Sequence, residues 1–194
     1  MRPSRIFRLL IRIFILLLTI SVSIVAFLGG LSAVMILSNP DNFGIDTGNA
    51  EFNIDFNNST LKIENINFTL PFNITNAGYF DLENLQLDLQ LGLNYSHIDG
   101  GGPGVNETRI VKILDRSQYF GDIAKGITGN FTFYGDNSSF IYSNFPDPLT
   151  EIDWFRGPPP LEFYANFTIS LDYSIGMQSI SITAINVFVG DFTP

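Results

Sequence analysis

The chain of 194 residues contains no cysteine, one histidine and one tryptophan, and only 15% of its residues are charged. The missing cysteine excludes disulfide bonds, thiolate catalysis and cysteine-ligated zinc or iron–sulfur sites. The single histidine excludes a metal site that needs two histidines. Hydrophobic residues make up 45% of the sequence, which is enough for a buried core, and the length suits one domain with an appendage.

Basic residues are few and unevenly placed. Arg2, Arg5, Arg8 and Arg12 stand in the first 37 residues, which hold no acidic residue. The rest of the chain has all 19 acidic residues against six basic ones, which gives a net charge of −13. Because an acidic domain repels phosphate backbones, we expect no nucleic-acid partner.

Residues 13–37 form a run of 25 residues without a charge. As a helix of about 37 Å, this run would cross a hydrocarbon core of about 30 Å. The alternative is a cleaved secretory signal, whose apolar part has only about 7–15 residues. Arginines precede the run, and Asp41 and Asp46 follow it. The positive-inside rule therefore predicts a single-pass protein of the cell membrane with a cytoplasmic N-terminus and an extracellular C-terminal domain.

Strand-like alternation dominates the remaining sequence. It is clearest in Glu162–Ile175, where seven apolar residues alternate with polar ones. Leu61–Thr75 and Leu82–Leu93 show the same period, with even-numbered apolar residues in the first and odd-numbered ones in the second. The segment Asn76–Gly78 between them predicts a turn that changes the buried parity, because Asn and Gly tolerate a positive φ.

Several other segments also have the sequence pattern of strands. Further strands are expected at Ala50–Phe56, Thr108–Asp115, Ile127–Tyr134, Ser139–Tyr142 and Ser179–Phe188. Residues 116–126 are expected to form a connection, and a parity shift near Ala184 indicates a bulge in the last strand. Pro71 lacks an N–H, which places its strand at a sheet edge or at a bulge.

These segments predict an all-β fold, namely an immunoglobulin-like β-sandwich of 7–8 strands preceded by one N-terminal transmembrane helix. A closed barrel is the alternative, whereas the polar outward residues exclude a transmembrane barrel. The predicted organisation is a basic cytoplasmic tip (1–12), a transmembrane helix (13–37), a stalk with a first strand (38–60) and the extracellular sandwich (61–194).

Nine Asn-x-Ser/Thr triplets occur, all after the apolar run. Composition alone would give roughly two or three such triplets by chance. Polar residues that recur two apart in strands explain part of the excess, and N-glycosylation of the outer surface is the preferred explanation. The candidate acceptors are Asn57, Asn58, Asn67, Asn73, Asn94, Asn106, Asn130, Asn137 and Asn166.

No catalytic constellation is apparent in the sequence. Ser96, His97 and Asp99 are neighbours along the chain, which does not give the geometry of a serine triad, and His97 is expected in an exposed loop. The glycine-rich segment 99–104 lacks the flanking strand and helix of a phosphate-binding loop. We therefore expect no cofactor and no enzymatic activity, with a carbohydrate-active enzyme as a distant alternative, because carboxylates are numerous.

Two weaker hypotheses concern loops. Asp147, Glu151 and Asp153 offer three carboxylates in one segment, which could hold a hard cation such as calcium. Aromatic side chains in several expected loops could form a platform for a sugar or a protein, although core packing explains them as well. They are Tyr134, Tyr142, Trp154 and Phe155.

The order of parts resembles one known family. A basic tip, an apolar helix and the short stalk SNPDNF are followed by INFTLPFNITNAGYFDLENLQLDLQLGL and later by GDIAKGITGNFTFY. This layout looks like the late-embryogenesis-abundant domain of the second type, which also occurs in membrane-anchored plant defence-related proteins. The resemblance covers residues 39–188 and implies an immunoglobulin-like sandwich with an envelope or protective role and no catalytic residues. Asn76-Ala77-Gly78 departs from the Asn-Pro pattern that the family often has at the first break.

We therefore predict a membrane-anchored cell-surface protein with a non-catalytic binding or structural role in the cell envelope. The alternative is an accessory or stator-like subunit of a surface filament or appendage. The expected partners are the lipid bilayer, through residues 13–37, and envelope proteins or polysaccharide. Small residues four apart would also allow a homo-oligomer through the helix, and these are Ala26, Gly29, Gly30 and Ala33.

Overall fold

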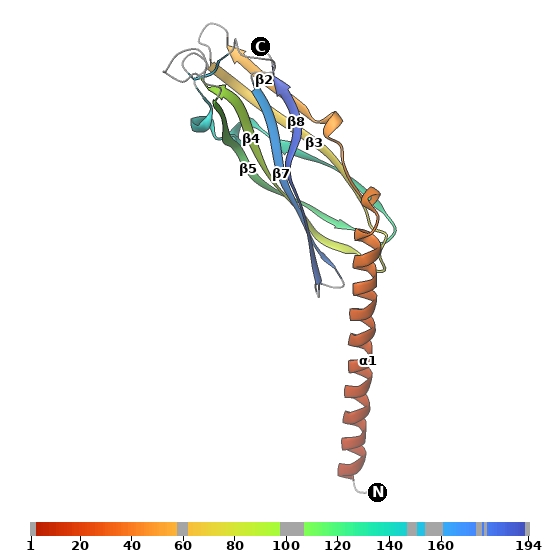
Figure 1. Ribbon diagram of the computed structural model, residues 1–194. Coiled ribbons are helices and arrows are strands. Elements are labelled where there is room, and N and C mark those ends of the chain that lie inside the picture. The colour runs from red at the N-terminus through yellow and green to blue at the C-terminus, as the bar shows by residue number, and fades with distance from the viewer. Residues whose placement is uncertain are drawn as a thin grey trace.

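The computed structural model describes residues 3–57, 62–97, 107–146, 151–153, 161–173, 176 and 178–192. Helix α1 (Pro3–Leu37) projects from one end of a β-sandwich (Figure 1). Its segment Phe7–Leu37 is long and apolar enough to cross a membrane, which is typical of an anchor or of a signal sequence. The hydroxyls of Thr19, Ser21 and Ser23 donate to the carbonyls four residues earlier, so they need no partner outside the helix.

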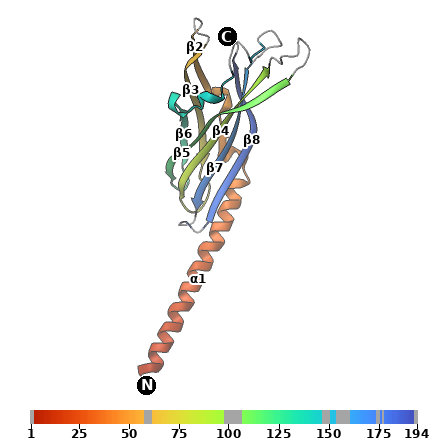
Figure 2. The same ribbon diagram turned by 90° about the vertical axis from the view of Figure 1, so that its left-hand side faces the viewer.

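Within the described ranges, eight strands form two antiparallel sheets. In the first sheet β3 (Lys62–Thr75) is central, β6 (Thr128–Gly135) pairs with one side of it, and β1 (Phe43–Ile45) and β2 (Glu51–Asn57) pair in succession with the other. The second sheet has the order β5 (Glu107–Ile123), β4 (Leu82–His97), β7 (Leu161–Tyr173) and β8 (Gln178–Phe192). The sheets pack face to face (Figure 2), so the predicted sandwich of seven to eight strands is confirmed.

The core lies between the sheets and follows the predicted alternation. Phe52 of β2 links the layers, because its ring centroid is 4.6 Å from that of Phe68 in its own sheet and 4.4 Å from that of Phe163 in the opposite sheet. Burying an aliphatic or aromatic side chain of this size contributes about 1.5–3 kcal/mol. The buried residues of the three central strands include Ile66, Phe68, Leu70, Phe72, Ile74, Leu85, Leu87, Leu89, Leu91, Leu93, Phe163, Ala165, Phe167, Ile169 and Leu171.

The buried parity changes inside β4, not at the turn before it, so that prediction was wrong. Leu82 is still buried, and the pairing register shifts between Leu82 and Leu85. Between them Asn84 has a φ of 56°, and its N–H donates to a carboxylate oxygen of Asp122 at 2.9 Å. An extra residue in one strand moves every later side chain to the opposite face, which is how this bulge places the odd-numbered leucines in the core.

Pro71 lies in the central strand β3, not at an edge or a bulge as its missing N–H predicted. In an antiparallel ladder the N and the carbonyl of one residue point to the same side. The Pro71 carbonyl accepts from the N–H of Asp46, in the gap between β1 and β2. No ladder hydrogen bond is lost there, because neither β1 nor β2 pairs with Pro71.

Two further predictions concern β5 and β8. Strand β5 continues to Ile123, so most of the expected connection at residues 116–126 is strand, and Phe120 packs against Phe72 at 5.0 Å between ring centroids. The bulge expected near Ala184 is confirmed, because Ile185 and Asn186 together oppose Asn166 of β7. Asn186 has a φ of 55° and donates its N–H to the side-chain oxygen of Asn166.

Asn76 is completely buried at the turn between β3 and β4. Its side-chain amide donates to the carbonyls of Phe80 at 2.9 Å and Ile123 at 3.0 Å, and its side-chain oxygen accepts from the N–H of Gly78 at 3.1 Å. None of residues 76–78 has a positive φ, so the expected reason for Asn and Gly in this turn was wrong. Asn76 is needed here for its hydrogen bonds, which satisfy two buried backbone groups and one partly buried one.

The segment between α1 and β2 is short and tied to its neighbours. It contains two 3₁₀ turns, η1 (Pro40–Asn42) and η2 (Thr47–Asn49), with β1 between them. Side chains cap both turns, since Asn39 accepts from the N–H of Asp41 and Asp46 accepts from the N–H of Asn49. The strand expected at Ala50–Phe56 corresponds to β2.

Candidate functional site

The outer face of the sheet β5–β4–β7–β8 is polar along its two central strands. The outward side chains of β4 and β7 alternate with the buried ones because successive residues of a strand point to opposite faces. Neighbouring side chains bond to one another across this face, as between Thr168 and Thr183 at 3.1 Å or between Gln86 and Asp88 at 2.8 Å. The outward residues of the central strands include Gln86, Asp88, Gln90, Gly92, Asn94, Glu162, Tyr164, Asn166, Thr168, Ser170 and Asp172.

One part of this face has a distinct chemistry, and we call Asn94, Glu162, Tyr164 and Phe188 the Tyr164 cluster. Asn94 donates its amide N–H, and Tyr164 its hydroxyl, to the same carboxylate oxygen of Glu162, each at 3.0 Å. The rings of Tyr164 and Phe188 pack edge to face with 5.8 Å between their centroids, and the Phe188 side chain is 49% exposed. Opposite Tyr164 on β4 stands Gly92, which has no side chain of its own, and the Ile110 side chain is the nearest to its Cβ position, at 3.5 Å.

Some polar groups of the Tyr164 cluster are hydrogen-bonded to one another, and one is not. The hydrogen bond to Glu162 raises the pKa of Tyr164 above its ordinary value, and loss of hydration acts in the same direction. The side-chain oxygen of Asn94 is buried without a hydrogen-bond partner among the described residues. An aromatic pair beside a carboxylate can stack on the apolar face of a ligand and accept hydrogen bonds from its hydroxyls.

Sequence reasoning missed this cluster, although Tyr164 gave a signal. Tyr164 occupies a polar position in the most regular alternation of the chain, so an aromatic side chain was predictable on the outer surface. The parity shift predicted near Ala184 also places Phe188 on the outer face, but nothing in β8 itself connects Phe188 with Tyr164. Its proximity to Tyr164 follows only from the pairing of β7 with β8.

The candidate glycosylation sites differ in exposure. Asn130 on β6 and Asn137 in the 3₁₀ turn Asn137–Ser139 are exposed, whereas Asn67, Asn73 and Asn166 are half-buried. The amide nitrogens of Asn57 and Asn94 donate to glutamate side chains, Glu64 and Glu162 respectively. A glycan attaches to this nitrogen, so Asn130 and Asn137 are the most favourable acceptors. Asn58 and Asn106 lie outside the described residues.

The expected loop sites are only partly within the described residues. Glu151 and Asp153 stand beside Ile152, which bridges to His97, while Asp147, Trp154 and Phe155 lie outside. Among the residues that the structure describes, no three acidic or histidine side chains form a group that could hold a metal ion. Tyr134 lies on β6 rather than in a loop and is 56% exposed. Burial raises the pKa of Tyr142, which packs on Phe145 at 5.8 Å between ring centroids.

His97 ends strand β4 and pairs with Glu107, so its expected position in an exposed loop was wrong. Its Nδ1 is buried and has no partner among the described residues. Adjacent strand residues face opposite sides, so Ser96 and His97 do not form a nucleophile–base pair. Nearby, loss of hydration and then the charge of Glu151 raise the pKa of Tyr95, and Arg109 acts against them.

The fold and surface define a class: a two-layer β-sandwich behind one long apolar helix, with a polar outer sheet face. No family model matches the chain, and no curated protein sequence matches it. Among solved structures, the sporulation control protein Spo0M from Bacillus subtilis is a distant match, with 16% sequence identity and a TM-score of 0.27. The match covers 72% of this chain and 47% of Spo0M, about half the length of that protein.

Proposed function

We propose that this protein is a single-pass membrane protein that displays an acidic β-sandwich on the outside of the cell, where the sandwich binds envelope polysaccharide or an envelope protein without catalysis. The observation that carries the proposal is the contrast between its two parts. Helix α1 exposes apolar side chains over most of its length, and it continues directly into a sandwich whose central strands carry polar side chains on their outer faces. An apolar helix of this kind needs lipid around it, whereas the polar faces need water.

The orientation rests on charge. The arginines of α1 precede its charge-free run, and the acidic sandwich follows. Arginine stays on the cytoplasmic side, so the sandwich faces outward. The exposed acceptors Asn130 and Asn137 agree with a glycosylated outer surface.

The Tyr164 cluster is the binding surface in this proposal. Saccharides present hydroxyls beside apolar ring faces, and the cluster offers an exposed Phe188 ring next to the Glu162 carboxylate. A protein partner with an amphipathic surface would use the same groups, because aromatic side chains with a polar tip are favoured at interfaces.

The resemblance to the second type of late-embryogenesis-abundant domain also supports the proposed structural role. The segment that carries it forms β3, the buried Asn76 turn and β4, so it supplies one central strand to each sheet. Such a segment would specify the sandwich but no catalytic group. A structural or protective role in the envelope is consistent with this.

The topology can be tested directly because the chain has no native cysteine. Arg5→Cys and Tyr134→Cys variants are treated with a membrane-impermeant maleimide, on intact cells and after lysis. We expect labelling of position 134 on intact cells and of position 5 only after lysis. Labelling of both on intact cells, or a mature protein whose intact mass lacks the first 37 residues, would refute the anchored topology.

The binding role needs a separate experiment. Cross-linking on intact cells followed by mass spectrometry identifies the envelope component next to the sandwich. Tyr164→Ala and Phe188→Ala should greatly reduce this cross-linking, and Tyr134→Ala, a matched exposed tyrosine on the other sheet, should not. Equal cross-linking by all three variants would exclude the Tyr164 cluster as the binding surface.

A further inference from the structure

The last two turns of α1 are part of the sandwich, not of a flexible linker. Ser32 and Ile36 are completely buried, and the hydroxyl oxygen of Ser32 accepts from the N–H of Tyr79 at 2.9 Å. The hydroxyl of Tyr173 accepts from the same N–H at 3.3 Å. At Gly78 a Cβ would lie 2.9 Å from the Tyr173 hydroxyl and 3.1 Å from Cβ of Ser32, so only glycine permits this close approach.

The end of the helix is fixed from a second side. The Asn42 side chain donates to the carbonyls of Met35 at 3.3 Å and Ile36 at 3.0 Å, which satisfies two carbonyls of the last turn. Asn42 is itself buried. With hydrogen bonds on both sides, the sandwich cannot rotate freely about the end of α1.

This joint determines how far the sandwich stands from a membrane. The turn 76–80 lies level with Ser32, five residues and therefore about 7.5 Å below the helix end at Leu37. From Ile13, which follows Arg12, to Leu31 the helix has 19 residues and a length of about 28 Å. A hydrocarbon core is about 30 Å thick. With Arg12 at the inner boundary, the docked turn therefore meets the outer boundary.

The side chains at this end suit the layer between lipid and water. Tyr79 is 41% exposed and Ile127 is 54% exposed, and the Lys125 ammonium lies 5.9 Å from the centroid of the Tyr79 ring. Asn76 joins the two turns that carry them, because its N–H donates to the Ile127 carbonyl at 2.9 Å and its carbonyl accepts from the N–H of Gly126 at 2.9 Å. Tyrosine and lysine are the residues that place an apolar body in lipid and a polar tip in the headgroups.

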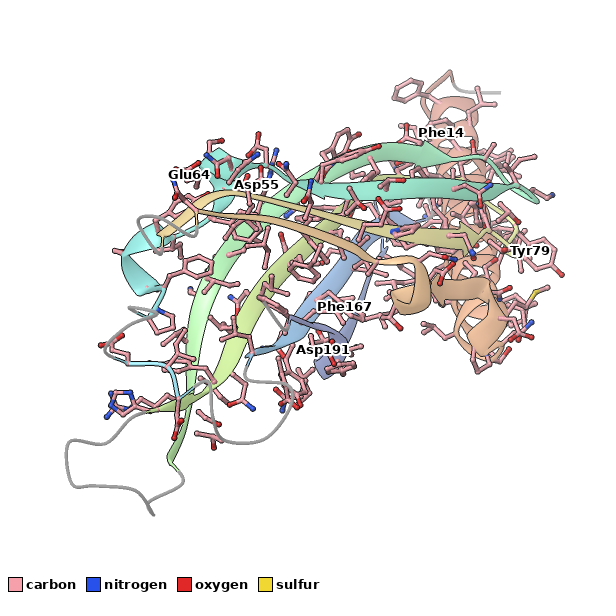
Figure 3. All side chains as sticks on the ribbon, turned by 90° about the horizontal axis from the view of Figure 1, so that it is seen from above. Phe14, Asp55, Glu64, Tyr79, Phe167 and Asp191 are labelled. Carbon is pink, nitrogen blue, oxygen red and sulfur yellow. The ribbon has the colours of Figure 1, made fainter. Side chains whose placement is uncertain are left out.

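The same end of the molecule leaves apolar helix surface uncovered. Several side chains of α1 near the joint remain 39–62% exposed, namely Leu31, Val34, Met35 and Leu37. Figure 3 shows Tyr79 beside α1, at the opposite end of the sandwich from Asp55 and Glu64. Water alone would solvate these apolar side chains poorly, whereas the interfacial layer of a bilayer accommodates them.

We infer that the helix-proximal end of the sandwich rests in the lipid headgroup layer, with Tyr79, Lys125 and Ile127 as its contacts. The inference depends on the proposed membrane anchor and adds a second lipid-binding surface that holds the sandwich in a fixed orientation. The acidic side chains of Asp81 and Asp122 are exposed close by, and they limit the contact to headgroups because carboxylates do not enter hydrocarbon. Zwitterionic lipid suits this mixture of charges better than strongly anionic lipid.

Single-cysteine spin labels in the full-length protein test this inference, in nanodiscs of phosphatidylcholine. The positions are 79, 127, 22 in the middle of α1, and 185 on β8, where Ile185 is 69% exposed. Tyr79→Cys keeps the joint, because the backbone N–H of residue 79 makes the contacts with Ser32 and Tyr173. The measured quantity is the accessibility of each label to dissolved oxygen and to a water-soluble nickel complex.

We expect labels at 79 and 127 to show a nickel accessibility severalfold lower than the label at 185, and a lower oxygen accessibility than the label at 22. Labels at 79 and 127 that match position 185, with position 22 in lipid, would overturn the inference and leave the anchor intact. A label at 22 that is as accessible to nickel as the label at 185 would refute the anchor and the inference together.

Discussion

Asn76 allows the sharpest test of how the sandwich is held together. In Asn76→Ala the buried carbonyl of Ile123, the buried N–H of Gly78 and the partly buried carbonyl of Phe80 lose their partner. A buried polar group left without a partner costs about 1–3 kcal/mol. At the lower end of this range for each group, the variant should lose about 3 kcal/mol of the about 5–15 kcal/mol that stabilise a typical domain.

Pulse proteolysis of the full-length protein in nanodiscs, over a series of urea concentrations, measures this loss. With a typical urea dependence of about 2 kcal/mol per molar, the midpoint should fall by about 1.5 M. Asn76→Asp keeps an acceptor for Gly78 but loses both amide donors and introduces a buried charge, so it should be at least as unstable.

Asn130→Ala is the matched control, because Asn130 lies on the exposed face of β6. Its unfolding free energy should change by no more than about 0.5 kcal/mol. If Asn76→Ala and Asn130→Ala gave the same midpoint, the three side-chain hydrogen bonds of Asn76 would contribute nothing measurable. The role assigned to this residue would then be wrong.

Three other outcomes are expected. Gly78→Ala should lower the unfolding free energy by about 1–3 kcal/mol in the same assay, because its Cβ would lie 2.9 Å from the Tyr173 hydroxyl. Asn130→Gln should remove one glycan mass in intact-mass spectrometry of protein purified from its native cells. The hydrogen bond to Glu162 raises the pKa of Tyr164 in the folded protein. The stability that this hydrogen bond confers should therefore be fully present below about pH 10 and should decrease as the pH rises further. Urea titrations at several pH values measure this dependence, and Glu162→Gln should weaken it.

Each of these has its own control. Gly92→Ala should be nearly neutral, since the nearest atom to its Cβ would be 3.5 Å away, and a loss equal to that of Gly78→Ala would contradict the packing argument. Asn94→Gln should leave the glycan mass unchanged, because Glu162 already binds its amide nitrogen. If Tyr164→Phe kept the pH dependence of the parent protein above pH 10, the dependence would not come from Tyr164.

Local pattern was enough to predict much of the fold. The charge-free run predicted α1, and period-two alternation predicted β3, β4 and β7 with the correct inward residues after Asn84. The bulge of β8 followed from the same reasoning. These features depend on a few consecutive residues, whose side chains must all reach one face of a helix or strand.

Features that depend on distant neighbours were not predictable in this way. Pro71 is tolerated in a central strand only because the edge beside it is divided between β1 and β2. Gly78 is explained by Ser32 and Tyr173, which are 46 and 95 residues away along the chain. Nothing within the turn itself indicates either contact.

The sequence by itself determined that this chain has one apolar helix, an acidic strand-rich remainder and a hydrophobic face on each long strand. Only the tertiary structure decided that the helix is locked to the sandwich through Tyr79, and that Tyr164 and Phe188 meet on the outer face. The reason is physical: alternation fixes which face of a strand is buried, whereas pairing across sheets and layers decides which residues of the exposed faces lie together.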